Sequence, residues 1–388
     1  MNETRQNQPV AVIGAGDMGH GIAEVALLAG YPVYLYDIKP EFLERGVQRI
    51  HDSLAKLEQK GKIDADTHER SRRLLHPTTD LAEAVSGARF VIEAVPEVLQ
   101  IKQDVFRRLD ELAPATAILG TNTSNMSITA IASATRRPER VVGVHFFNPV
   151  VLMKLVEVIR GEQTTEETMQ QAVAFCRTLE KVPIRVEKDV PSFIVNRINA
   201  PIRVFLGAVV DAGEATPEAI DAMVRSAGEP MGPFELLDYV GLDITYDSMV
   251  YRQQVLDAEY GPFATLEKLV KAGHLGKKTG QGFYDWSQGR PSIDLSQKTD
   301  VITFRDIQFV KLNEATKLME QGVSNARDID RAMVLGTGDR VGPVEACMDV
   351  APDVITTRLD ELASRYQKHI LQPTNLLRTG GYLSGYGS

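Results

Sequence analysis

Short apolar runs alternate with helix-like patterns through the first half of the chain. Runs rich in β-branched residues are predicted to form strands at 9–15, 31–37, 89–95, 116–122, 140–147, 154–160 and 182–188. Their apolar positions are nearly continuous, which is typical of strands that helices cover on both faces. Strands that alternate with helices in this way predict a parallel α/β sheet of the doubly wound, Rossmann type.

A long charged segment at 41–75 separates the second predicted strand from the third. Its apolar positions recur at helical spacing on either side of a turn at 61–64, so we expect two antiparallel helices that project from the sheet at about 39–76. From about residue 190 onward the pattern is helical. We therefore expect the α/β domain to occupy residues 1–189.

Two stretches of the helical half resemble each other. The Gly-Pro pairs at 232–233 and 342–343 lie 110 residues apart, and each occurs in a similar apolar pattern. A repeat that preserves both apolar spacing and its turn is most simply a duplicated domain. We expect two tandem all-α C-terminal domains at 190–286 and 301–388, joined by a polar linker at 287–300, with the second copy degenerate.

Composition narrows the possible partners and compartments. The formal charge of −9 argues against nucleic acid or an anionic membrane as the main partner. No stretch approaches the roughly 18 uninterrupted apolar residues of a membrane span, and the first residues do not resemble a signal peptide. Cys176 and Cys347 are too few for a disulfide framework or a thiolate zinc site. We expect a cytoplasmic protein without a metal site.

A glycine-rich turn follows the first predicted strand and opens a helix. Its glycines are Gly14, Gly16 and Gly19, in the pattern G-x-G-x-x-G. The first permits a tight turn, the second lets a pyrophosphate approach the backbone, and the third allows helix and strand to pack closely. Asp37, at the end of the second strand, can bind both ribose hydroxyls and would repel a 2′-phosphate. The pattern predicts NAD rather than NADP as the cofactor.

One histidine interrupts the apolar run GVHFFNPV. His145 lies near the end of a predicted strand, where ligands bind in doubly wound folds, and Glu157 lies on a buried face of the next strand. A glutamate bound to one imidazole nitrogen leaves the other free to act as general base, which oxidation of an alcohol requires. The alternatives are a structural buried histidine and a structural ion pair between Glu157 and a nearby lysine or arginine.

Six motifs in order carry a family resemblance: GAGDMGHGIA, NTSNMSI, GVHFFNPVVLMKLVEVI, PSFIVNRI, GPFELLDYVGLD and LGKKTGQGFY. Together they resemble the NAD-dependent L-3-hydroxyacyl-CoA dehydrogenases over about residues 8–286. The resemblance implies that His145 and Glu157 form the catalytic pair. It also implies that Ser124 hydrogen-bonds the substrate's hydroxyl or carbonyl oxygen and that Asn196 holds the substrate near its thioester.

The remaining binding positions are expected in three places: the glycine turn, the acid after the second strand, and residues that match family contacts. For NAD these positions are Gly14, Gly16, Asp17, Met18, Gly19, Asp37, Glu97, Lys102, Asn148 and Lys278. For coenzyme A they are Ser53 and Lys60, with Ser124 at the acyl group. An acid as close to the pyrophosphate as Asp17 should weaken binding unless its side chain points away. His20 is interpreted as a helix-surface residue.

Three functions are compatible with these motifs. The first is oxidation of a short-chain (S)-3-hydroxyacyl-CoA, such as 3-hydroxybutyryl-CoA, to the 3-ketoacyl-CoA, as in fatty-acid metabolism. The second is a dehydrogenase of the same family acting on a free hydroxy acid, such as the sugar acid L-gulonate. Such an enzyme does not need Ser53 and Lys60 as coenzyme A contacts. The third is a catalytically silent NAD-binding protein, against which the intact catalytic positions argue. The coenzyme A positions favour the first.

The second helical copy departs from the motifs of the first. It has no asparagine near the place of Asn196 and lacks the Lys-Lys pair at 277–278. We therefore interpret this copy as structural. It could dock on the first copy and replace the dimer contact of single-copy relatives, which would give a monomeric pseudo-dimer; a homodimer through other surfaces is the alternative.

Overall fold

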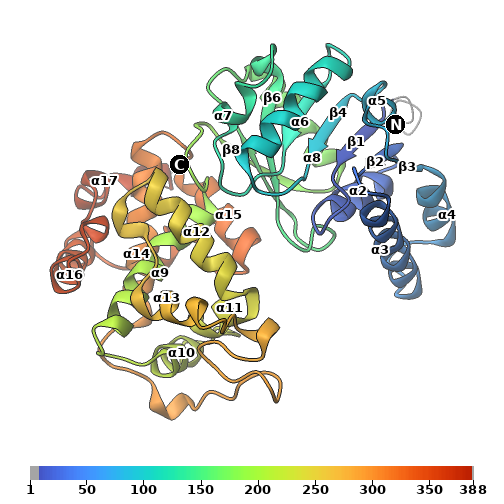
Figure 1. The fold of residues 1–388 in the computed structure, drawn as a ribbon. Coiled ribbons are helices and arrows are strands. Elements are labelled where there is room, and N and C mark those ends of the chain that lie inside the picture. The colour runs from blue at the N-terminus through green and yellow to red at the C-terminus, as the bar shows by residue number, and fades with distance from the viewer. Residues whose placement is uncertain (1–7, 387–388) are drawn as a thin grey trace. The chain divides into compact units, whose positions relative to one another are not determined.

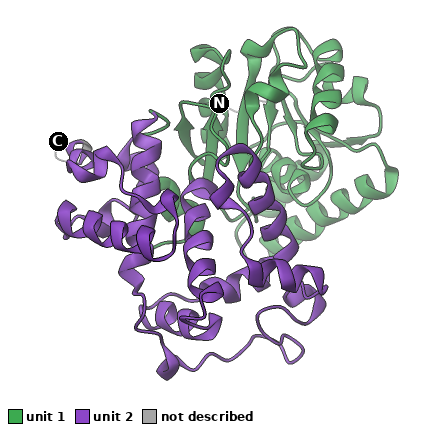
Figure 2. Cartoon of the chain, turned by 60° about the vertical axis from the view of Figure 1, so that its left-hand side comes forward, with its two compact units in different colours: residues 1–194, 322–324, 331–340 green, residues 195–321, 325–330, 341–388 purple. Residues whose placement is uncertain are grey.

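The computed structural model describes residues 8–386, which fall into two compact units (Figure 2). Unit 1 contains the described residues up to 194 together with 322–324 and 331–340. Unit 2 contains 195–321, 325–330 and the described residues from 341 onward. No helix among the described residues is long and apolar enough to cross a membrane.

Unit 1 is built on an eight-stranded sheet with the order β3-β2-β1-β4-β5-β6-β7-β8. The strands are β1 (Val10–Ile13), β2 (Val33–Tyr36), β3 (Leu75–Thr78), β4 (Phe90–Glu93), β5 (Ile118–Thr121), β6 (Val141–Phe146), β7 (Leu155–Ile159) and β8 (Val182–Val186). Neighbouring strands are parallel except β6 and β7, which are antiparallel. The predicted Rossmann-type sheet is thus confirmed, with one antiparallel pair.

The edge strand β3 was not predicted. Its sequence, Leu-His-Pro-Thr, has one buried apolar residue and a proline, and it follows directly on a highly charged helix. Proline is tolerated at a sheet edge because an edge strand leaves one row of N–H groups unpaired. The strand forms because it pairs in parallel with β2, with Val33 opposite Leu75. This pairing joins residues far apart in the sequence, so the local pattern of residues could not predict it.

The helices of unit 1 lie between the strands in sequence. They are α2 (Gly19–Leu28), α3 (Pro40–Gln59), α4 (Ala65–Arg73), α5 (Leu81–Val85), α6 (Leu99–Leu112), α7 (Ile128–Ala132), η1 (Pro138–Arg140) and α8 (Glu166–Thr178). Figure 1 shows α3 and α4, in blue, near β2 and β3. They occupy the charged segment for which a helix pair is expected. In α3 the buried positions Leu43, Ile50 and Leu54 recur at helical spacing.

Unit 2 is helical. Its first part contains α9 (Val195–Asp211), α10 (Pro217–Ser226), α11 (Pro233–Val240), α12 (Leu242–Val255), η2 (Ala258–Tyr260), α13 (Ala264–Lys271), η3 (Lys277–Thr279) and η4 (Leu295–Gln297). The later part contains α14 (Phe304–Glu320), η5 (Glu345–Cys347), α16 (Pro352–Arg365), η6 (His369–Leu371), α17 (Asn375–Arg378) and η7 (Gly381–Gly385). The helix α15 (Ala326–Thr337) has residues in both units.

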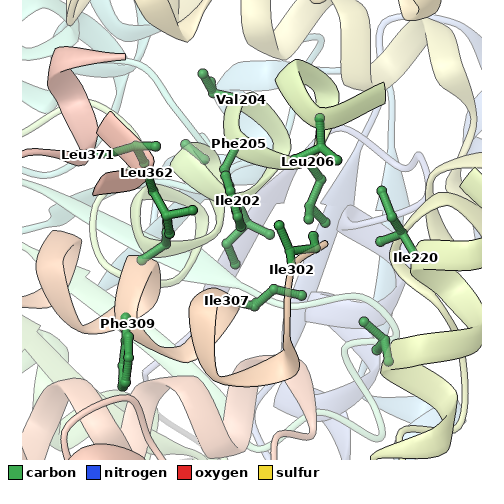
Figure 3. Packing of buried hydrophobic residues seen from close by; sticks show 14 of the residues in the cluster. Ile202, Val204, Phe205, Leu206, Ile220, Ile302, Ile307, Phe309, Leu362 and Leu371 are labelled. Atoms are coloured by element: carbon green, nitrogen blue, oxygen red, sulfur yellow. The ribbon is translucent and has the colours of Figure 1, made fainter. Parts of the chain in front are cut away.

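The two helical parts of unit 2 share one hydrophobic core. Figure 3 shows residues of α9, such as Phe205 and Leu206, beside residues of the later part, such as Ile302, Ile307 and Leu362. All belong to one contiguous cluster of buried side chains. The polar linker at 287–300 therefore does not separate two independent cores.

The internal repeat is visible in individual hydrogen bonds. Asp221 accepts from the backbone N–H groups of 234 and 235 at 2.9 and 2.7 Å, and Asp330 accepts from those of 344 and 345 at 2.8 and 2.9 Å. In both copies a Cβ on the glycine of the Gly-Pro pair would lie 2.2 Å from an atom of this aspartate. A tyrosine hydroxyl also donates to each aspartate: Tyr284 and Tyr386. The duplication predicted from the spacing is confirmed at this level.

Candidate active site

The glycine turn between β1 and α2 has the geometry that an anion site requires. Gly14 has φ +106°, and a Cβ there would lie 2.7 Å from the carbonyl oxygen of Ala94. A Cβ on Gly19 would lie 1.7 Å from the carbonyl oxygen of Gly14, whereas one on Gly16 would meet nothing within 4 Å. The outer glycines are thus required for packing, and Gly16 faces open space. This arrangement fits a pyrophosphate at the N-terminus of α2.

Asp37 follows β2 and is connected to the glycine turn. One carboxylate oxygen accepts the N–H of Ala15 at 2.9 Å, and the other accepts the N–H of Lys39 at 3.2 Å. The carboxylate is therefore fixed at the carboxyl ends of β1 and β2. An acid at this place fits the ribose of a dinucleotide and disfavours a 2′-phosphate.

Asp17 and His20, the unusual residues of the turn, each have a local partner. Asp17 forms an ion pair with Arg49 of α3, and its side chain is 81% exposed. The guanidinium group neutralises the charge of Asp17. The carboxylate also points toward solvent, as expected if an acid this close to the pyrophosphate site is not to weaken binding. The Nδ1 of His20 lies 2.8 Å from the carbonyl oxygen of Gly16. Met18, immediately before α2, packs partly against the core of unit 1.

A buried ion-pair network lies at the end of β4. The ammonium group of Lys102 is 2.7 Å from Oε1 of Glu93 and 3.3 Å from Oε2 of Glu97, and the lysine side chain is 1% exposed. Glu93 also accepts the hydroxyl of Thr121 at 2.7 Å. Sequence reasoning missed Glu93, although a carboxylate at the end of a buried strand is a signal that could have found it.

Glu97 holds the turn that carries Ser124. Its Oε1 accepts the hydroxyl of Thr123 at 2.6 Å and the backbone N–H groups of Ser124 and Asn125 at 2.9 and 3.2 Å. The turn follows β5, next to β6 in the sheet. The pair Lys102 and Glu97 thus fixes the turn of Ser124 at the carboxyl edge of the sheet.

His145 and Glu157 are direct cross-strand neighbours. The antiparallel register of β6 and β7 places them opposite each other, so their side chains lie on the same face of the sheet. Nδ1 of His145 is 2.7 Å from Oε2 of Glu157, and the two side chains are 5% and 0% exposed. The other carboxylate oxygen accepts the N–H of Ile194 at 3.1 Å. Because Nδ1 donates to the carboxylate, Nε2 is the nitrogen that can accept a proton.

Two further features hold the histidine in place. The rings of Phe147 and Phe193 lie 4.5 and 5.8 Å from the His145 ring, measured between centroids. The side-chain oxygen of Asn122, after β5, accepts the N–H of Phe146 at 2.9 Å. The sequence analysis identified none of these supports, although Asn122 is a polar residue at a strand end.

Asn148 lies in the exposed loop after β6, and its peptide bond with Pro149 is cis. The buried ammonium group of Lys181 donates to the carbonyl oxygen of Val150, and to that of Met153 at 2.8 Å. Lys181, which precedes β8, thereby holds the loop that carries Asn148. The sequence analysis did not single out this lysine.

The coenzyme A candidates lie on and just after α3. Ser53 is half-buried and hydrogen-bonds the carboxyl group of Glu24 on α2, whereas Lys60, which caps α3, is exposed. Asn196, in the first turn of α9, and Lys278, which forms an ion pair with Asp243, belong to unit 2. The structure thus brings the glycine turn, Asp37, Glu97, Lys102, Ser124 and the histidine–glutamate pair together at the carboxyl edge of one sheet.

Comparisons with known proteins show the family of this chain. The family model of the 3-hydroxyacyl-CoA dehydrogenase NAD-binding domain matches residues 9–190, and that of the C-terminal domain matches residues 193–286 and 305–382. The chain belongs to the 3-hydroxyacyl-CoA dehydrogenase family. The matches confirm the predicted family, the oxidoreductase class and NAD as the cofactor.

Relatives in the 3-hydroxyacyl-CoA dehydrogenase family match either nearly all or about 72% of this chain. The chain is 32% identical to 3-hydroxyadipyl-CoA dehydrogenase of Escherichia coli K12, over 98% of this chain and 99% of that protein. It is 42% identical to a probable 3-hydroxybutyryl-CoA dehydrogenase of Bacillus subtilis, over 72% of this chain and 97% of that protein. The crystal structure of 3-hydroxybutyryl-CoA dehydrogenase from E. coli K12 matches with a TM-score of 0.90 and 33% identity, over 98% of this chain and 99% of that one.

Proposed function

We propose that this family member oxidises a short-chain (S)-3-hydroxyacyl-CoA, similar to 3-hydroxybutyryl-CoA, to the 3-ketoacyl-CoA. The observation that carries the proposal is the pair of His145 and Glu157, joined at 2.7 Å on adjacent strands at the edge of the sheet where the glycine turn also lies. The names of the relatives support an acyl-CoA substrate with a 3-hydroxyl group.

In the proposed mechanism His145 is the general base. Its Nε2 takes the proton of the substrate hydroxyl, while Nδ1 stays bound to Glu157, whose charge stabilises the imidazolium. The hydroxyl group of Ser124 donates to the same substrate oxygen and fixes its position. NAD, when bound, supplies the acceptor for the hydride. The burial of both members of the pair excludes water, which strengthens the interaction between their charges.

The proposed cofactor site uses the backbone of the glycine turn and the carboxylate of Asp37. The open space at Gly16 admits a pyrophosphate, and the Asp37 carboxylate accepts hydrogen bonds from ribose hydroxyls. Arg49, which neutralises Asp17, lowers the electrostatic cost of an anion near this turn.

The experiment that tests the proposal is a comparison of substrates with the purified protein. NADH consumption is followed with acetoacetyl-CoA and with free acetoacetate, and NAD reduction is followed with L-gulonate and other sugar acids. We expect turnover with the CoA thioester and none with the free acids. Turnover confined to the free acids would contradict the proposed substrate and the role of Ser53 and Lys60. Binding of NAD without any turnover would favour a silent NAD-binding protein.

A further inference from the structure

One glutamate of the second helical copy is the centre of a buried polar cluster in unit 2. Glu314 of α14 is 0% exposed. It accepts from Nε of Arg197 at 2.5 Å, from the hydroxyl of Tyr260 at 3.0 and 3.1 Å, and from the ammonium group of Lys317 at 2.9 Å. Arg197 and Tyr260 come from the first copy. The second copy therefore supplies the acceptor for two buried groups of the first.

The contact between Arg197 and Glu314 is a buried ion pair. The arginine is 7% exposed, so neither charge can be solvated by water if the other is removed. Burial opposes the charged form of each group, yet Lys317 and Arg197 hold the pKa of Glu314 below its usual value. The carboxylate is thus ionised at neutral pH and fixes the position of the guanidinium group.

The pair breaks the symmetry of the repeat. α9 and α14 are both 17 residues long and correspond end to end, so that each residue of α9 has an equivalent 109 positions later. The equivalent of Glu314 in the first copy is Phe205, and the equivalent of Arg197 in the second copy is Asp306. A reciprocal ion pair would need an acid in place of Phe205 and a base in place of Asp306. It is therefore absent.

The retained ion pair lies next to a predicted substrate contact. Arg197 directly follows Asn196, in the first turn of α9. The equivalent of Asn196 in the second copy is Arg305, whereas Asp306 pairs with Arg358 of its own copy at 2.8 Å. The ion pair of Arg197 with Glu314, here called the cross-copy anchor, is thus present at the start of α9, which carries Asn196. An equivalent anchor is missing at the start of α14, which has no asparagine at that position.

We propose that the second helical copy supplies Glu314 as a positioning residue, which holds Arg197 and thereby orients Asn196 for the substrate. The first turn of a helix lacks part of its backbone hydrogen bonding and frays easily. An ion pair from its third residue into the core fixes this turn. The proposal rests on the proposed function for the role of Asn196, and it gives the second copy a part in substrate binding beyond structural support.

The test is a double-mutant cycle with Glu314→Gln and Asn196→Ala, assayed by acetoacetyl-CoA reduction. Glu314→Gln should lower kcat/KM for acetoacetyl-CoA about tenfold, with the KM for NADH unchanged. Asn196→Ala should cost much less in the Glu314→Gln background than in the wild type, because the asparagine is already misplaced. Hydrogen exchange of a peptide covering 195–205 should be faster in Glu314→Gln than in the wild type.

The matched control is Asp306→Asn, which breaks the corresponding ion pair within the second copy. It should lower Tm but leave kcat, both KM values and the exchange of 195–205 unchanged. If Glu314→Gln does not fold, Glu314→Asp, which keeps the charge, carries the same cycle with a smaller expected effect.

Additive effects in the cycle, or wild-type kinetics in Glu314→Gln, would overturn the anchor. A wild-type protein that does not reduce acetoacetyl-CoA would contradict the proposed function instead. In that case the hydrogen exchange of 195–205 tests the anchor by itself. Faster exchange in Glu314→Gln but not in Asp306→Asn supports the anchor, and equal exchange in these two variants refutes it.

Discussion

At the residue scale, the site depends on one cross-strand pair. His145 and Glu157 are twelve positions apart, and the turn between β6 and β7 places them directly opposite each other. The spacing allowed this pairing but did not require it, because a shift of one residue in register would turn one side chain to the other face. Both faces of these strands are buried, so the apolar pattern does not distinguish the two registers. A shift would instead leave two buried polar groups without each other as partners, which is costly.

His145→Ala should remove most turnover while NAD affinity stays nearly unchanged. Loss of a general base typically costs about a hundredfold to ten-thousandfold in rate. Glu157→Gln should cost less, because the imidazole remains and only its tautomer and charge are less well supported. The measurements are kcat with acetoacetyl-CoA and NADH, and NAD affinity by calorimetry. A His145→Ala variant with substantial turnover would show that another group is the base.

At the element scale, a buried carboxylate joins the helices of the α/β unit. Glu24 of α2 is 1% exposed, its Oε1 has no hydrogen-bond partner among the described residues, and its carboxyl group hydrogen-bonds Ser53 of α3. Burial raises the pKa of Glu24 to about 7, against the opposing effects of Ser53 and Lys181. The same Lys181 holds the loop of Asn148. We therefore expect the packing of α2 on α3 to depend on the protonation of this side chain.

This pKa predicts how stability depends on pH. The pKa of Glu24 rises from 4.5 to about 7 on folding. Its contribution to stability is therefore fully present below pH 4.5 and is lost as the pH rises to about 7. A shift of this size corresponds to roughly 3 kcal/mol. Glu24→Gln abolishes the titration, so the Tm of the variant relative to the wild type should increase between pH 5 and pH 8.

Thermal unfolding at several pH values measures this difference, and Glu44→Gln is the matched control. Glu44 lies on α3 and is exposed, so its replacement should change Tm by the same small amount at every pH. A Tm difference for Glu24→Gln that does not change with pH would show that Glu24 is already ionised in the folded protein at pH 5.

At the scale of the whole molecule, the two helical copies contribute to one buried core. Phe205 and Leu206 of α9 are buried in a cluster to which both copies contribute. The B. subtilis relative matches 72% of this chain over 97% of its own length. We infer that the second copy takes the place of a partner subunit, so that the full-length protein is a monomeric pseudo-dimer.

Removal of residues 301–388 should therefore expose a large apolar face. We expect the truncated protein to dimerise or aggregate, whereas the full-length protein elutes as a monomer. Light scattering coupled to size-exclusion chromatography measures both masses. A truncated protein that stays monomeric and keeps its Tm would show that the first copy closes its own core. A dimeric full-length protein would contradict the pseudo-dimer.

The sequence by itself determined the features that depend on local spacing. The glycine turn, Asp37 and seven strands of unit 1 follow from neighbours in the chain, because turns, helix starts and apolar periods are encoded within a few residues. The internal repeat follows from the similarity of two stretches of the sequence. The family resemblance supported the candidate catalytic pair and added Ser124, Asn196 and the further NAD and coenzyme A positions.

Only the tertiary structure decided which distant groups meet. The network of Glu93 and Lys102, the support of β6 by Asn122 and the ion pair of Arg197 with Glu314 each join residues from different elements. The edge strand β3 likewise exists because β2 lies beside it. Such contacts depend on how elements pack, and a buried charge gives no local sign of its partner. The sequence therefore predicted the candidate reacting groups, and the fold supplied the groups that hold them.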